Sequence, residues 1–171
     1  MIRIGKLDLK DQIVVSDPCY CDFDNPWIKQ LKIVPGEYNC FVDYIEDETR
    51  VSSMLLINKN TNEKNIDEEI ADVGVDSGTM AIFTLEKYKE LVKIKKEQEE
   101  EFYKYSYNLS AKTFAETNEC MASIYDNIFI SSSGYGDGDY IVYVKRNKEG
   151  NIIALKIVFI YEEEYEYEDE E

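Results

Sequence analysis

A glycine-rich segment at residues 131–140, with the sequence SSSGYGDGDY, is the feature that most constrains how this chain folds. Its three glycines stand at alternate positions, where they allow sharp turns and close approach of other groups. Apolar runs typical of β-strands flank it at residues 128–130 and 140–144. Two aspartates and several hydroxyl groups lie among the glycines, more polar chemistry than a simple connection needs. The segment therefore indicates a strand–loop–strand unit whose loop presents more polar groups than the turn itself requires, as a binding surface would.

Most of the remaining chain has the composition of β-strands. Residues 37–45 and 51–58 are expected to pair as an antiparallel hairpin, since polar residues separate two β-type runs. Residues 152–160 are almost continuously apolar, which favours a central strand buried on both faces. Further strands are expected at residues 13–16 and on both sides of a tight turn within residues 73–83.

Two helices are expected in the middle of the chain. Thr84 is suited to cap the first helix, whose apolar residues recur at helical spacing on one face. The charged run 93–101 is expected to continue that helix into solvent. A second, weaker helix is expected from Ser110 to Ile124, with Phe114 and Met121 facing inward. The sequence thus predicts an α+β fold, a largely antiparallel sheet of six to nine strands with two helices inserted mid-chain.

Charge and length set the domain organisation. The chain of 171 residues is long enough for one domain with a real core, and we expect that domain to span residues 1–160. Residues 161–171 hold eight acidic residues and no basic one. Such a tail gains little by docking and repels itself, so we expect it to be disordered.

The net charge of −17 bears on the kind of partner. Without the tail the charge is still −9, so the body is acidic as well. A strongly negative surface repels phosphates and acidic lipids, which argues against ordinary nucleic-acid or membrane binding. Solubility is the simplest explanation of the charge. The alternative is mimicry of a polyanion, in which the carboxylates occupy a basic groove of a partner protein.

Histidine is absent from the chain, which excludes Ser-His-Asp and Cys-His catalysis and histidine-containing zinc sites. No apolar run approaches the ~20 residues that span a bilayer, and the first residues lack the pattern of a signal peptide. We therefore expect a cytoplasmic protein with reduced cysteines. The four thiols belong to Cys19, Cys21, Cys40 and Cys120.

Three motifs resemble a known family. The segments VGVDSG at residues 73–78 and SSGYGDGDY at residues 132–140 are similar to a "VDAG"-like turn and an "SSGWGDGxY"-like loop of DUF4241, a family of bacterial and phage proteins of unknown function. VSDPCY at residues 15–20 fits an upstream "DP" element, and Ser77 and Tyr135 depart from the family's Ala and Trp. The resemblance implies a shared fold and supplies no activity.

Each of the three motifs follows a β-type run and places aspartate beside a turn. If the strands are neighbours in one sheet, four aspartates could converge at one end and bind Ca²⁺ or Mg²⁺, which prefer oxygen ligands. The alternative is that each aspartate only caps its own turn. The metal candidates are Asp17, Asp76, Asp137 and Asp139. The candidate binding residues are Asp17, Cys19, Tyr20, Trp27, Asp76, Ser77, Ser132, Ser133, Tyr135, Asp137 and Asp139.

These features leave several functions open. The favoured hypothesis is a small acidic protein-binding module of the immunity-like or phage counter-defence type, with a protein as its partner and no cofactor. The alternative is a carboxylate- or metal-dependent hydrolase of a small substrate, in which Ser77 or Cys19 is the nucleophile. A structural or accessory protein without a pocket is the third. No catalytic residue is assigned.

Overall fold

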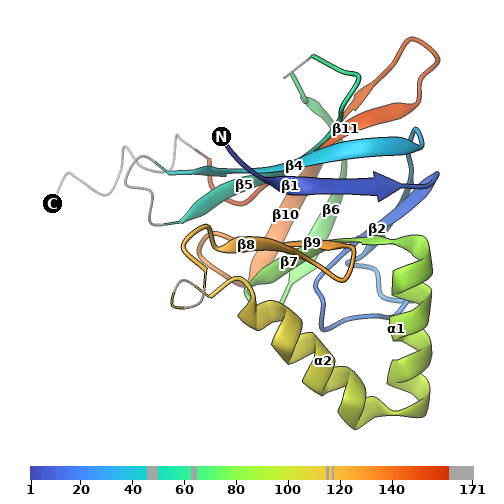
Figure 1. The fold of residues 1–171 in the computed structure, drawn as a ribbon, viewed down its shortest axis with the longest axis vertical. Helices are drawn as coiled ribbons and strands as arrows, with labels where there is room; N and C mark the ends of the chain where they lie inside the picture. Colours follow the sequence, from blue (N-terminus) through green and yellow to red (C-terminus); the bar gives the residue numbers. More distant parts are fainter. Residues whose placement is uncertain (46–49, 63–64, 115, 117, 162–171) are drawn as a thin grey trace, which may run out of the picture.

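The computed structural model describes residues 1–45, 50–62, 65–114, 116 and 118–161, which form two antiparallel sheets and two helices (Figure 1). The α+β class and the antiparallel pairing are therefore confirmed. Eleven strands are present in the described residues, more than the six to nine expected. Their order in the six-stranded sheet is β1 (Ile2–Leu9), β4 (Gly36–Tyr44), β5 (Val51–Asn58), β11 (Ile152–Val158), β10 (Gly138–Arg146) and β6 (Glu68–Val75).

The second sheet has five strands and packs beneath the first (Figure 1). Its strand order is β3 (Lys29–Lys32), β2 (Gln12–Ser16), β7 (Thr79–Thr84), β9 (Ile128–Ser132) and β8 (Ala122–Tyr125). Several connections cross from one sheet to the other, including the turn from β6 to β7 and the loop from β9 to β10. The aspartate-bearing bends therefore lie where the two sheets meet, and not along one end of a single sheet.

Both faces of the five-stranded sheet are buried, and the alternation of side chains shows how. Ile13, Val15 and Ile82 point into the core between the two sheets. Val14 and Phe83 point to the opposite face, where the helices cover them. A strand that is apolar on both faces reads as an unbroken apolar run, which is why residues 13–16 and 79–83 are recognisable in the sequence.

The helices cover the outer face of the five-stranded sheet (Figure 1). Helix α1 (Leu85–Glu97) begins as expected, because the Thr84 hydroxyl accepts a hydrogen bond from the Lys87 amide at 3.2 Å. The charged run continues α1 only as far as Glu97. The helix is interrupted at Gln98. Helix α2 (Glu99–Ala111) then turns back, so that Phe102 packs in the same core as Leu91.

The prediction of a helix at residues 110–124 is wrong. Helix α2 ends at Ala111, and residues 122–125 form β8, which pairs with β9. Asp126 and Asn127 both have positive φ, 51° and 59°, as a tight hairpin turn requires. Phe114 is 44% exposed and not inward-facing, whereas Met121 and Ile124 pack against the core between the sheets.

Two of the edge strands, β1 and β3, are not predicted from the sequence. Strand β1 carries charged residues and a glycine, and β3 is only four residues long. By contrast, the hairpin of β4 and β5 and the central place of β11 match the expectations. Residues 162–171 of the expected tail lie outside the described residues. No helix in the described ranges is long and apolar enough to cross a membrane.

Candidate functional site

Three bends far apart in sequence meet at the junction of the two sheets. They are the bend after β2, the turn between β6 and β7, and the loop between β9 and β10. Each motif singled out in the sequence contributes one bend. The contacts between them include hydrogen bonds from backbone amides to aspartate side chains, which tie the bends together.

Asp17 is the centre of this junction. Its side chain is fully buried, and each of its two carboxylate oxygens accepts two hydrogen bonds. The Cys19 amide and the Ser77 hydroxyl donate to Oδ1 at 2.7 and 2.8 Å. The amides of Asp76 and Ser77 donate to Oδ2 at 2.8 and 2.7 Å. A buried carboxylate with four donors is a stable structural anchor, and it has little capacity left for an external ligand.

The Ser77 hydroxyl extends the junction into the helical layer. It lies 2.7 Å from the Thr79 hydroxyl, which in turn lies 3.0 Å from the Ser110 hydroxyl near the end of α2. Thr79 and Ser110 are both buried. The chain of hydroxyl groups thus connects the β6–β7 turn to α2, and buried polar networks that are satisfied in this way hold one arrangement.

The third bend is fixed through Gly78. Its amide donates to Asp137 Oδ1 at 3.0 Å, and its carbonyl accepts from the Ser133 amide at 3.1 Å. Gly78 has a φ of +69°, which glycine adopts without strain. Asp137 therefore has a turn-capping role on one oxygen and remains exposed to solvent.

The exposed side of the junction is a shallow hollow of about 410 Å³. Five side chains that line it form what we call the aspartate–aromatic surface: Tyr20, Trp27, Asp76, Asp137 and Asp139. The Tyr20 hydroxyl donates to Asp76 Oδ2 at 3.0 Å. Burial and this carboxylate raise the pKa of Tyr20, so Tyr20 remains a neutral donor at neutral pH.

Trp27 lies on strand β6 at Gly74. A β-carbon added to Gly74 would be 3.0 Å from both Cβ and Cγ of Trp27. The Gly74 amide also donates to the Trp27 carbonyl at 3.1 Å. Trp27 nevertheless remains 44% exposed. The absence of a side chain at Gly74 therefore lets the indole lie directly on the sheet while part of it faces solvent.

The charge of this surface is not paired with a basic side chain in the described part of the chain. Among the ion pairs of the described residues, none involves Asp76, Asp137 or Asp139. Lys95 lies nearby but donates to the Tyr20 carbonyl and packs over the Phe102 ring. The three aspartates thus present negative charge to whatever occupies the hollow.

The family model of DUF4241, described as a protein of unknown function, matches residues 10–157. The chain belongs to the DUF4241 family. The matched region contains all three bends and the whole aspartate–aromatic surface, whereas β1 lies outside it. No curated protein and no solved structure matches this DUF4241 chain.

The candidate nucleophiles Cys19 and Ser77 of this DUF4241 protein lie at the buried junction around Asp17. Burial and the neighbouring Asp17 carboxylate raise the pKa of the Cys19 thiol, and a protonated thiol is a poor nucleophile. Burial likewise raises the pKa of Cys21 to about 12. The Ser77 hydroxyl is engaged by Asp17 and Thr79. All four cysteines are free thiols.

The remaining candidates of the glycine loop do not line the hollow. The Ser133 hydroxyl donates to the Gly136 carbonyl at 2.8 Å and shapes the loop from within. The Ser132 amide donates to the Met121 carbonyl at 2.9 Å. Tyr135 is 58% exposed and lies under the Arg50 guanidinium, 4.8 Å from the ring centroid. Tyr135 is therefore a separate exposed aromatic residue.

The four metal candidates do not form a closed ligand set. Asp17 is engaged by protein donors, and within the described parts of the chain no three Asp, Glu or Cys side chains form a group that could hold a metal ion. A Ca²⁺ or Mg²⁺ site in the DUF4241 chain stays an untested prediction.

Several contributors to the site were not identified from the sequence. Gly74 stands inside the VGVDSG motif but gives no sign that Trp27 lies on it. Thr79, Ser110 and Lys95 come from segments that look like ordinary strand and helix. Only long-range pairing brings them to the junction, and a single sequence carries no signal of it.

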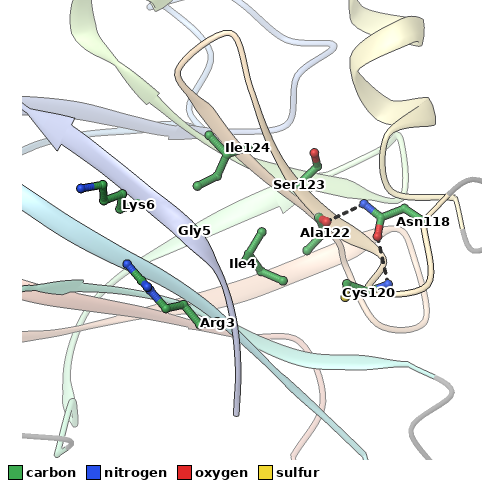
Figure 2. A pocket seen from close by; sticks show the side chains of 9 residues that line it. All are labelled: Arg3, Ile4, Gly5, Lys6, Asn118, Cys120, Ala122, Ser123 and Ile124. Atoms are coloured by element: carbon green, nitrogen blue, oxygen red, sulfur yellow. Dashed lines mark hydrogen bonds between the residues drawn. The ribbon is translucent and has the colours of Figure 1, made fainter.

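A second, slightly larger hollow of about 460 Å³ lies between the edge strands β1 and β8 (Figure 2). Its polar groups are largely used within the protein. Asn118 donates to the carbonyls of Lys112 and Ala122 and accepts from the Cys120 amide, and Lys6 pairs with Glu37 at 2.8 Å. We therefore place the candidate site of the DUF4241 protein at the smaller hollow, where exposed carboxylates are without cationic partners among the described residues.

Proposed function

We propose that this protein is a binding module that contacts another protein through the aspartate–aromatic surface. Support comes above all from the combination of an exposed Trp27 and three unneutralised aspartates on one hollow. Tryptophan and tyrosine are the residues that most often dominate binding energy at protein interfaces. The proposal includes a cytoplasmic setting and an inhibitory role of the immunity-like or phage counter-defence kind, in which the partner presents a basic surface.

The support beneath the surface also favours binding. Asp17 and Asp137 fix the three bends through backbone amides, so the aromatic and acidic groups are presented on anchored loops. Preorganisation of this kind reduces the entropy lost on association. Opposite charges on the partner would then speed encounter and select among partners.

A hydrolase would place different demands on the same residues. Ser77 or Cys19 would need to be activated, but the Cys19 thiol has a raised pKa. The carboxylate that accepts from the Ser77 hydroxyl, Asp17, is buried and already accepts three backbone amides, which makes it a weak base. These contacts favour the binding role. A melting temperature raised by millimolar Ca²⁺ or Mg²⁺ would instead support the metal-dependent alternative, because a ligand of the native state stabilises it.

The proposal is tested by comparing two matched double variants. Asp76→Asn with Asp139→Asn removes two charges from the surface, while the amide oxygen introduced at the first position can still accept from the Tyr20 hydroxyl. Glu100→Gln with Glu149→Gln removes two exposed charges elsewhere, on α2 and in the β10–β11 turn. A partner captured from host lysate on the wild-type protein is purified, and its affinity for all three proteins is measured by calorimetry.

We expect the surface variant to bind the partner at least about tenfold more weakly, a loss of ~1.4 kcal/mol. The control variant is expected to bind within about twofold of wild type, since exposed charges remote from the interface act on the partner only through attraction that salt screens. Equal losses in both variants would mean that only the overall charge matters and would overturn the proposed surface.

A further inference from the structure

We propose that the hollow of the aspartate–aromatic surface receives one arginine side chain of the partner, stacked on Trp27 and bonded to the aspartates. This inference rests on the proposed function and names the chemistry that the site recognises. Three features of the hollow support it: its aromatic walls, the placement of its charges, and its size.

The aromatic walls suit a flat cation. Trp27 lies against Gly74 and stays 44% exposed beside the hollow, and Tyr20 forms a second aromatic wall. Tryptophan is the best aromatic partner for a cation, and arginine the most frequent cation in such contacts. The guanidinium group is planar and weakly hydrated, so it stacks on an aromatic face more readily than the ammonium of lysine does.

The aspartates supply acceptors at separate points around the hollow. Asp76 accepts a hydrogen bond from Tyr20 and Asp137 accepts one from Gly78, while Asp139 is exposed on β10. An ionised carboxylate has about four acceptor positions, so each retains capacity for further donors. A guanidinium carries five N–H donors spread over a fork, which matches acceptors on different residues better than a compact metal ion would.

The size of the hollow fits one side chain. Its volume of about 410 Å³ lies near the lower end of the range for small-ligand sites. Basic side chains of neighbouring segments are engaged elsewhere: Lys95 donates to the Tyr20 carbonyl, and Lys29 donates to the Pro26 carbonyl. Among the described residues no basic side chain pairs with the aspartates of this acidic, aromatic hollow, and we infer that the complement is supplied by another molecule.

The first test uses three short peptides, acetyl-Gly-Arg-Gly-amide and the same peptide with citrulline or lysine in place of arginine. Trp27 is the only tryptophan of the chain, so its fluorescence reports on this site alone. We expect the arginine peptide to change Trp27 emission saturably with a Kd in the millimolar range. The lysine peptide should bind several-fold more weakly, and the uncharged citrulline peptide should cause no saturable change.

The second test places the binding at the hollow. Asp139→Asn is expected to weaken the arginine peptide about three- to tenfold, whereas Glu149→Gln leaves its Kd unchanged within about twofold. Equal responses to arginine and citrulline peptides, no response to either, or equal losses in both variants would overturn the inference.

The outcome is separable from that of the proposed function. If the purified partner depends on Asp76 and Asp139 but tolerates replacement of each of its arginines by glutamine, the binding module stands and the arginine inference fails. If the arginine peptide binds at Trp27 but the partner ignores the surface double variant, the pocket stands and the protein-binding role of this surface fails.

Discussion

Asp17 shows how one residue can determine the geometry of a site without contacting a ligand. Its carboxylate is fully buried, yet each oxygen accepts two donors. Charge-assisted bonds to backbone amides are among the stronger hydrogen bonds in proteins. The sequence indicates that Asp17 belongs with the other aspartates but not that it is buried, since burial depends on which strands surround it.

Replacing Asp17 by asparagine is expected to destabilise the protein by roughly 2–4 kcal/mol. The amide nitrogen would face two donors and leave them without an acceptor, and each unsatisfied buried group costs about 1–3 kcal/mol. Urea unfolding of Asp17→Asn gives the change in free energy of unfolding. Asp139→Asn, on the exposed rim, is the control and should stay within about 0.5 kcal/mol of wild type. Equal effects of the two substitutions would contradict the role given to Asp17.

At the scale of elements, strands buried on both faces are the ones that the sequence reveals. Residues 13–16, 79–83 and 152–160 are rich in apolar side chains and coincide with β2, β7 and β11 to within two residues. The helix predicted over residues 110–124 is wrong because the spaced apolar residues of this segment are compatible with a helix as well as with β8. Pairing with β9 decides between the two, and this contact is invisible to a local pattern.

Strand β6 contributes to the site through Gly74, which has no side chain to displace Trp27. Gly74→Ala would place a methyl group 3.0 Å from Cβ and Cγ of Trp27, so the indole must shift. We expect a loss of ~1 kcal/mol in stability, as for mild overpacking, together with altered Trp27 emission. Gly78→Ala is the matched control. No atom lies within 4 Å of its added methyl group, so it should cost ~1 kcal/mol through its positive φ and leave the emission unchanged. Unaltered emission in Gly74→Ala would contradict the packing of Trp27 on β6.

At the scale of the whole molecule, two sheets replace the single sheet on which convergence of the aspartates was expected to depend. The bends still meet, because the connections from β6 to β7 and from β9 to β10 both pass between the sheets at the same junction. The sequence thus carries the local motifs and the family, while the arrangement of layers and the placement of Trp27 on β6 come only from long-range packing.

The net charge of the whole molecule favours the approach of basic partners. With a net charge of −17, the protein attracts basic partners over long range, and salt weakens that attraction. The aromatic contact at Trp27 is short-ranged and specific. Long-range attraction followed by docking at one hollow is the account proposed for this DUF4241 protein.

Acrylamide quenching of Trp27 fluorescence, in the free protein and in complex with the purified partner, tests this account most directly. The free indole is 44% exposed, so quenching should be efficient. We expect the partner to lower the quenching constant at least about twofold, because it covers the hollow. A complex that forms while Trp27 stays as accessible as before would contradict the proposal, since the partner would then bind elsewhere.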